Sequence, residues 1–347
     1  MNNRSAGPRS FNTVERSNRE PRLRRLQQCR ILLLAICSLI LLLALTGLVF
    51  LFCQIGHSVA TANPGGGKSG KVVYGDFTTN ATNPDALVNL YTGDLILVNT
   101  AHAYRFPSTR LEDLSDGEKQ AYNLLEYRVR VNEELPYVIR TAGERNFMNP
   151  KAAEAMNRFL TAYYTRTGEQ LTFYEGYRSY QYQEELKSQQ VPAGCSDQHT
   201  GLSGAISNSA QSVKLTAEQL TELTRICAQY GFIQRYPTDK SGETGISGYT
   251  ELFRYVGVPH ALYITRQNLS LEGYIKLLQT TYTYSGNHLL LDADGGVVTK
   301  DAAYEIYYVP VSGDSATVPV PKNYKYSISG DNVGGFIVTV DLNSPVA

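Results

Sequence analysis

The chain has 347 residues and equal numbers of basic and acidic side chains, 32 of each. The charges are unevenly distributed, because residues 1–30 hold eight arginines and two glutamates, which leaves 24 basic and 30 acidic residues for the rest. A nucleic-acid-binding domain carries a basic patch on its folded part. The charge distribution therefore excludes nucleic acid as a partner of the folded part.

Residues 31–52 contain no charged side chain over 22 positions and read ILLLAICSLILLLALTGLVFLF. At about 1.5 Å per residue, such a helix is long enough for a hydrocarbon core of about 30 Å. It is also longer than the apolar region of a signal peptide. Arginines crowd its N-terminal side, and an excess of Lys and Arg marks the cytoplasmic flank of a span. We therefore expect a cytoplasmic basic tail at 1–30, a transmembrane helix at 31–53, and a single-pass protein of the cell membrane whose C-terminal domain is extracytoplasmic.

Residues 54–84 are rich in Gly, Asn, Thr and Ser, and this composition predicts a flexible linker. A folded domain is expected over residues 85–281. It opens with a short β-rich run at residues 94–99. A capping box that begins at Ser115 predicts a helix to about residue 133.

Caps and breakers mark the later helices of this domain. Asn149 precedes Pro150 at a first helical position, and Gly168 ends that helix. Thr216 caps another helix, which ends at Gly231. We also expect one helix that holds Gln183 and Leu186, and another at 269–279 that Gly273 interrupts. Strands are expected at 171–174, 201–207, 232–236 and 245–256.

The composition changes near residue 282. Short alternating segments such as AYEIYYVPV, KYSISG and GFIVTV follow a turn with the sequence Asp-Gly-Gly. Alternation of apolar and polar residues over four to eight positions is typical of half-buried strands. We expect residues 282–347 to form a small β extension of three or four strands that carries no catalytic signature.

Four motifs in the folded domain resemble those of the VanY-type D-alanyl-D-alanine carboxypeptidases. In that family one stretch reads S-x-H-x-x-G-x-A-x-D and another reads E-P-W-H-x-R-Y-V-G. The resemblance implies an α+β fold, in which a small antiparallel sheet is flanked by helices and carries a zinc site. The matching segments here are GYRS at 176–179, GCSDQHTGLSGAIS at 194–207, GFIQRYP at 231–237 and GYTELFRYVG at 248–257.

The frame of these motifs is intact, but the metal-binding residue types are absent. The resemblance places the two His ligands at Gln198 and Leu252, the Asp ligand at Ala205 and the catalytic Glu at Tyr249. A hydrolytic zinc ion needs three protein ligands with nitrogen, sulfur or carboxylate oxygen. Ala and Leu have no such atom, and a phenol with a pKa of about 10 is a poor base near neutral pH. The sequence therefore predicts that no zinc cofactor is bound.

A shift of one residue does not restore the ligands. If His199 were the first ligand, the acidic partner would fall on the apolar Ile206. His260 lies three residues after Gly257 rather than after a Glu. Glu251 is acidic but has no His three residues later.

Arg178 is the best candidate for substrate binding. The resemblance implies that the Arg of the GYRS motif binds the C-terminal carboxylate of the D-Ala peptide, with Gln183 and Ser196 on the same cleft. A guanidinium suits a carboxylate, because it donates two parallel hydrogen bonds. The alternative is a structural Arg paired with a nearby Asp or Glu.

Two cysteines, Cys195 and Cys227, lie in the expected extracytoplasmic part. A disulfide between them is permitted in that compartment. Cys227 also lies on an apolar helical stripe, which favours a core residue and a free thiol at Cys195.

Two functions remain open from the sequence. The first is a catalytically inactive module that binds the peptidoglycan stem peptide or a cell-envelope protein. The second is a working D-alanyl-D-alanine carboxypeptidase whose metal is held by unidentified ligands. Chemistry at the site outweighs analogy between folds, so the first function is favoured.

Overall fold

The computed structural model describes residues 71–106, 115, 140–141, 146–188, 190–208 and 214–346, all within one compact unit, Pro64–Ala347. The expected basic tail, the expected membrane span and nearly all of the expected helix at 115–133 lie outside the described residues. Among the helices that are described, none combines the length and the apolar character needed to cross a bilayer.

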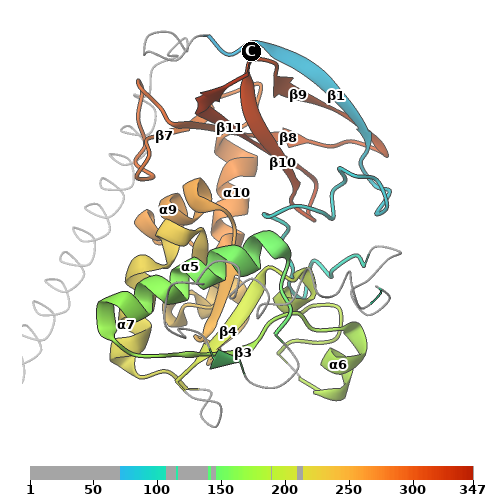
Figure 1. Ribbon diagram of the computed structural model, residues 1–347. Coiled ribbons are helices and arrows are strands. Elements are labelled where there is room, and N and C mark those ends of the chain that lie inside the picture. Colours follow the sequence, from blue (N-terminus) through green and yellow to red (C-terminus); the bar gives the residue numbers. More distant parts are fainter. Residues whose placement is uncertain are drawn as a thin grey trace, which may run out of the picture. The chain divides into compact units, whose positions relative to one another are not determined.

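A five-stranded sheet forms the centre of the domain, in the strand order β2-β3-β4-β6-β5. Every neighbouring pair is antiparallel except β2 and β3, which are parallel. Helices pack against this sheet, so the predicted α+β class with a small, mainly antiparallel sheet is confirmed (Figure 1). The strands are β2 (Arg140–Thr141), β3 (Thr172–Glu175), β4 (Ser203–Ser207), β5 (Phe232–Gln234) and β6 (Leu252–Tyr255).

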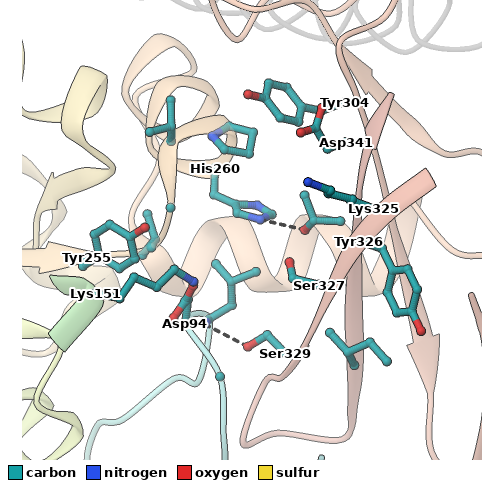
Figure 2. Close-up of a pocket in the computed structure, with 18 residues that line it drawn as sticks. Asp94, Lys151, Tyr255, His260, Tyr304, Lys325, Tyr326, Ser327, Ser329 and Asp341 are labelled. Carbon is teal, nitrogen blue, oxygen red and sulfur yellow. Dashed lines mark hydrogen bonds and ion pairs between the residues drawn. The ribbon is translucent and has the colours of Figure 1, made fainter. Parts of the chain in front are cut away.

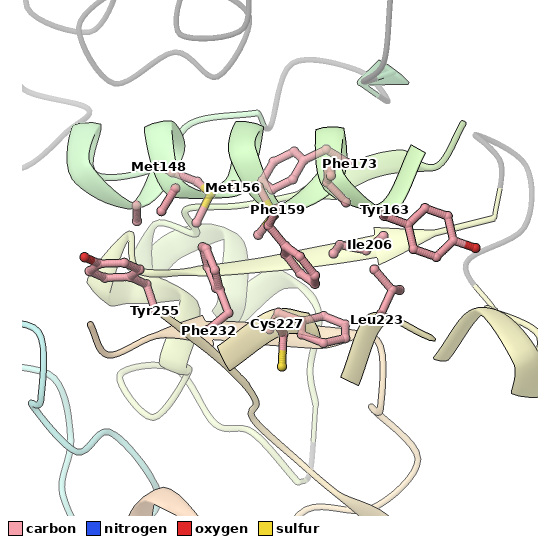
Figure 3. Packing of buried hydrophobic residues seen from close by; sticks show 14 of the residues in the cluster. Met148, Met156, Phe159, Tyr163, Phe173, Ile206, Leu223, Cys227, Phe232 and Tyr255 are labelled. Atoms are coloured by element: carbon pink, nitrogen blue, oxygen red, sulfur yellow. The ribbon is translucent and has the colours of Figure 1, made fainter. Parts of the chain in front are cut away.

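Helix α5 (Pro150–Thr167) covers one face of the sheet (Figure 1). The Asn149 side chain accepts a hydrogen bond from the Lys151 backbone N–H, and Gly168 ends the helix in the left-handed conformation. The buried Phe159 of α5 lies 5.7 Å from Phe232 and 5.5 Å from Phe253, measured between ring centroids (Figure 3). These contacts join the helix to β5 and β6 in the largest apolar cluster near the sheet.

Helix α7 (Ala217–Ile226) and the 3₁₀ turn η3 (Cys227–Tyr230) close the same cluster. The Thr216 and Gln219 side chains form the predicted capping box. Gly231 ends the segment at a φ of 82°, where a Cβ atom would lie 2.7 Å from the Tyr255 ring. Glycine is therefore required at this turn both by its conformation and by the close approach of β6.

Two helices on the other side of β5 differ from the predictions. Helix α9 (Val258–Arg266), which was not expected, begins directly after Gly257. Helix α10 (Leu271–Thr281) is capped by Ser270 and runs through Gly273 without interruption. Its apolar side packs with α9 in a second cluster, and this packing outweighs the low helix propensity of one glycine.

Residues 94–99 form no strand, although Leu95, Ile96, Leu97 and Val98 are buried. Their backbone groups bond to side chains and loops instead of to a neighbouring strand. The expected strand at 245–256 is also confined to β6, because the residues before Leu252 form turns. The remaining short helical segments are α6 (Tyr180–Glu185), η2 (Asp197–Thr200), η4 (Thr238–Lys240) and α8 (Ser241–Thr244).

The C-terminal residues form a second, four-stranded antiparallel sheet in the order β10-β11-β8-β7, together with a separate two-stranded ribbon of β1 and β9. Strand β1 lies within residues 54–84, which were expected to be a flexible linker, so these residues of that range form a strand instead. Its residues pair over seven positions with β9. These strands are β1 (Tyr74–Asn80), β7 (Leu289–Leu291), β8 (Tyr304–Pro310), β9 (Ser315–Pro321), β10 (Tyr324–Gly330) and β11 (Gly335–Pro345).

Candidate functional site

The four positions at which the motifs lack metal-binding residues lie together on the central sheet. Ala205 of β4 and Leu252 of β6 are directly opposite each other in the antiparallel register. The Tyr249 hydroxyl donates a hydrogen bond of 2.9 Å to Gln198 Oε1, just before β4. Four residues spread from Gln198 to Leu252 in the sequence thus meet at one place on the sheet.

Apolar side chains fill this place. Ala205 and Leu252 point away from the core beneath α5 and form a separate cluster with Tyr236 and Ile246, against which Tyr249 packs. Ala205 and Leu252 are completely or almost completely buried. Neither side chain has a nitrogen, sulfur or carboxylate oxygen that could bind a metal ion.

The polar members of the site do not fit a zinc ion either. The Gln198 amide is engaged at both ends, because its Nε2 donates to the Gly176 carbonyl at 2.8 Å. Burial raises the pKa of the Tyr249 hydroxyl well above its ordinary value, which makes it a still poorer base. Across the part of the chain that the structure describes, no group of three His, Cys, Asp or Glu residues is placed to hold a metal.

Arg178 lies beside this site and is already bonded to carboxylate. Its Nε and Nη2 both donate to Glu175 Oε2, the former at 2.8 Å, and its Nη1 donates to Gln183 Oε1 at 3.0 Å. Nη2 also lies 3.4 Å from the Tyr249 hydroxyl. The Arg178 side chain is 14% exposed and that of Glu175 only 3%. An internal carboxylate therefore occupies the Nε and Nη2 side of the guanidinium.

The other two predicted binding residues are close to Arg178 and also have internal partners. Gln183 is buried on α6, and its Nε2 donates to the Val191 carbonyl at 2.7 Å. Ser196 caps η2 by accepting a hydrogen bond from the Gln198 backbone N–H. Gln183 thus contacts Arg178 directly, and Ser196 is linked to it through Gln198, whose carbonyl accepts from the Arg178 backbone N–H at 3.3 Å.

A buried ion network, which the sequence did not reveal, supports the back of the site. Asp197 Oδ1 accepts hydrogen bonds from Arg254 at 2.7 Å and from Arg235 at 3.0 Å, and all three side chains are completely buried. Arg235 also forms two bonds, of 2.9 and 2.8 Å, with Glu272 of α10. Burial alone would raise the pKa of Asp197, but the two guanidinium groups hold that pKa below its usual range.

The same network anchors the buried segment at residues 94–98. Arg254 Nη2 donates to the carbonyls of Asp94 and Ile96, and Arg235 Nη2 donates to that of Val98. The arginines of two motifs are therefore structural. They tie β5, β6 and η2 to a chain segment more than 100 residues away.

Both histidines considered as alternative ligands have other roles. His199 bonds through Nδ1 to the Arg178 carbonyl at 2.7 Å and through Nε2 to the Gly194 backbone N–H at 3.1 Å. His260 is buried between the Tyr274 and Thr339 hydroxyls, and burial, with a smaller effect from Lys151, lowers its pKa to about 3. Both imidazoles are thus fixed by hydrogen bonds within the fold. Neither belongs to the cluster around Ala205 and Leu252.

Cys195 and Cys227 are free thiols. Cys227 belongs to the apolar cluster beneath α5, and burial raises the pKa of its thiol to about 12. The core interpretation of Cys227 therefore agrees with the structure.

Comparison with known proteins is consistent with the motifs and with the sheet. Residues 145–258 match the family model of VanY, D-alanyl-D-alanine carboxypeptidase. These residues include the Ala205–Leu252 cluster and Arg178 with its partners Glu175 and Gln183. This part of the chain is thus of the VanY type.

Curated proteins similar to this chain come from enterococci. A D-alanyl-D-alanine carboxypeptidase of Enterococcus faecium is 29% identical over 260 residues, which cover 72% of this chain and 76% of the relative. A second one, of Enterococcus faecalis, is 29% identical and covers 52% of this chain, which spans 65% of that relative's length. A bifunctional D-Ala-D-Ala dipeptidase and carboxypeptidase of Enterococcus gallinarum is 54% identical over 52 residues, 15% of this chain and 27% of its own.

Among solved structures, the vancomycin-resistance D,D-dipeptidase VanXYg, determined in complex with a D-Ala-D-Ala phosphinate analog, has the same fold. The TM-score is 0.59 at 24% identity, and the match covers 78% of this chain and 99% of the other. The similarity therefore extends beyond residues 145–258 into parts of the chain that the family model does not cover.

Proposed function

We propose that this VanY-family protein is a catalytically inactive member, a binding or regulatory module of the cell envelope. The observation that carries this proposal is the apolar cluster at the metal position, where Ala205 faces Leu252 across two strands. Without a metal to lower the pKa of water, and without a carboxylate base, the groups needed to activate water are missing. The residues that the resemblance assigns to binding, Arg178, Gln183 and Ser196, are present beside this cluster.

The purified full-length chain should contain no stoichiometric zinc and should release no D-Ala from a pentapeptide stem. Elemental analysis and an assay for free D-alanine measure the two properties. About one equivalent of tightly held zinc, together with D-Ala release, would instead make the chain a working carboxypeptidase. That is the activity in the name of the Enterococcus faecium relative.

The ligand that best fits the inactive site is a peptide with a terminal carboxylate, of the D-Ala-D-Ala class that relatives are named for. In this proposal the peptide carboxylate replaces Glu175 at Arg178, while Gln183 and Ser196 assist. Exchange of one carboxylate for another keeps the guanidinium paired, and the displaced Glu175 carboxylate retains the Gln198 amide, whose Nε2 lies 3.5 Å from Glu175 Oε2. The competition with Glu175 distinguishes this proposal from a purely structural role for Arg178.

Arg178→Ala should weaken binding of a D-Ala-D-Ala-terminated peptide by about 10- to 150-fold, because a charge-assisted hydrogen bond contributes roughly 1.5–3 kcal/mol. Glu175→Gln should strengthen it, because the internal competitor loses its charge. Calorimetric titration with the acid peptide and with its C-terminal amide measures both effects. If Arg178→Ala lowers the melting temperature but leaves the affinity unchanged, or if acid and amide bind equally, the carboxylate-binding role is excluded.

We also propose that the chain is anchored in the cell membrane by residues 31–53, with residues 1–30 in the cytoplasm. Eight arginines before the apolar stretch support this orientation. Protease added to intact protoplasts should remove the C-terminal domain and leave the N-terminal tail protected. Protection of the C-terminal domain would reverse the proposed topology.

A further inference from the structure

A pocket lies between the C-terminal sheet and the start of α9, and none of the residues of the Ala205–Leu252 cluster lines it. Its volume is about 490 Å³, within the range of roughly 300–1,000 Å³ that is typical of ligand pockets. Three chain segments line it, at residues 93–95, 255–260 and 325–329. Figure 2 shows Lys325, Tyr304 and Asp341 at one end and the Lys151–Asp94 ion pair at the other.

One wall of this pocket is the edge of a strand. Strand β10 is the outermost strand of its sheet among the described residues, and the pocket touches five consecutive residues of it, 325–329. Successive side chains of a strand point to opposite faces. The pocket therefore includes Tyr326 and Ile328 as well as their neighbours Lys325, Ser327 and Ser329, whose side chains point to the other face.

The backbone groups along this edge are directed outward at alternate residues. The Gly330 N–H donates to the Thr92 carbonyl at 2.8 Å, so Gly330 points its backbone away from β11. In an antiparallel pair the residues alternate between bonding to the partner and facing away. Ile328 and Tyr326 therefore direct their N–H and C=O groups outward as well. Among the described residues, none forms a hydrogen bond to these outward groups.

The sheet face beside this edge is also polar and close to α9. Ser327 is opposite Thr339 in the register, and Thr339 Oγ1 lies 2.9 Å from His260 Nε2. Lys325 lies two residues from Ser327 and thus on this same face, opposite Asp341 of β11. Tyr326 points to the other face and is 42% exposed.

The charges of the pocket are not all compensated within it. Lys151 is paired with Asp94, and Asp341 accepts hydrogen bonds from the Asn343 N–H and the Ser344 hydroxyl. Within the described part of the chain, Lys325 has no ion-pair partner. It is exposed at the end of the pocket and is the cation available to an incoming carboxylate.

We propose that the edge of β10 binds an extended peptide, which adds to the sheet as a further strand and places a carboxylate against Lys325. An extended peptide backbone presents donors and acceptors at the spacing that the outward groups of Tyr326 and Ile328 require. The main-chain bonds would supply affinity, and the charge of Lys325 would select the carboxylate. This site is separate from Arg178 and does not depend on whether the VanY site binds stem peptide.

The test uses the full-length chain and a library of acetylated L-hexapeptides with free C-terminal carboxylates. Peptides selected from the library should bind Ile328→Pro about 2- to 12-fold more weakly, because proline removes the outward N–H and is tolerated on an edge strand. Lys325→Gln should weaken carboxylate-ended peptides and leave their C-terminal amides unchanged. Lys322→Gln, an exposed lysine outside the pocket, is the matched control and should have no effect.

Methylation of alternate amide nitrogens in the selected peptide provides a test that needs no protein variant. Methylation of the nitrogens that face β10 should abolish binding, while methylation of the intervening ones should not. The proposal is overturned if no peptide is selected, or if selected peptides are insensitive both to methylation and to Lys325→Gln. It is also overturned if sedimentation shows that the chain pairs with a second copy through β10, with a dimer that Ile328→Pro dissociates.

Discussion

Asp197→Asn should destabilise the folded chain by about 3–5 kcal/mol, the cost typical of removing one partner from a buried ion pair. Asp197 lies between Arg235 and Arg254, and all three side chains are completely buried. Arg235 would keep Glu272, but Arg254 would keep only uncharged oxygens as partners, namely backbone carbonyls and the amide oxygen of the new side chain. Because native proteins are stable by only about 5–15 kcal/mol, the loss would remove a large part of the total.

Urea unfolding of the two chains measures this difference. Glu222→Gln is a matched control, since Glu222 also contacts two arginines, Arg166 and Arg225, but those arginines are about half exposed. Exposed ion pairs contribute little, so this variant should unfold close to the wild type. Equal effects of the two substitutions would show that burial of the Asp197 network is not what stabilises the fold.

The pKa of Asp197 also predicts how stability depends on pH. Its pKa is lower in the folded chain than the unperturbed value of about 3.9 in the unfolded chain. The stabilisation is therefore fully present above about pH 4 and is lost as pH falls through the folded pKa. The difference in stability between the wild type and Asp197→Asn should accordingly shrink below about pH 4.

Elements set by local chemistry were predictable from the sequence. The Asn149 cap, the proline after it and Gly168 define α5 within a few residues, and the Thr216 capping box begins α7. These signals act through side chains and turns within four residues of one another. The motif spacing likewise placed Ala205 and Leu252 at the same site, where they face each other across two strands.

Elements that depend on distant partners were missed. Strand β1 pairs with β9, about 240 residues later, and its residues alone resemble a linker. The partners of Asp197 lie 38 and 57 residues away, so no local pattern marks the ion network. Helix α9 did carry a signal, Pro259 in its first turn, which could have been recognised. The internal pairing of Arg178 with Glu175 had been considered only as one alternative.

Restoring the three ligand types, with Gln198→His, Ala205→Asp and Leu252→His, should create a zinc site in this chain. Side chains directly opposite on antiparallel strands have Cβ atoms about 4.5–5.5 Å apart, which suits two ligands of one metal at about 2.0–2.2 Å each. Gln198 reaches the same place, since it bonds to Tyr249 beside the cluster. D-Ala release is not expected, because Tyr249 still stands at the position of the base.

The triple variant should be less stable than the wild type without zinc and should regain stability with it. New polar groups in the apolar cluster cost about 1–3 kcal/mol each when they lack partners. Zinc at 100 times its dissociation constant would return about 2.7 kcal/mol. Thermal unfolding with and without zinc, and elemental analysis, measure the two effects. The control is the double variant that keeps Ala205, which should bind zinc far more weakly because it lacks the third ligand. If zinc changes neither the folded fraction nor the melting temperature of the triple variant, these positions are not former metal ligands, and the central argument for an inactive enzyme fails.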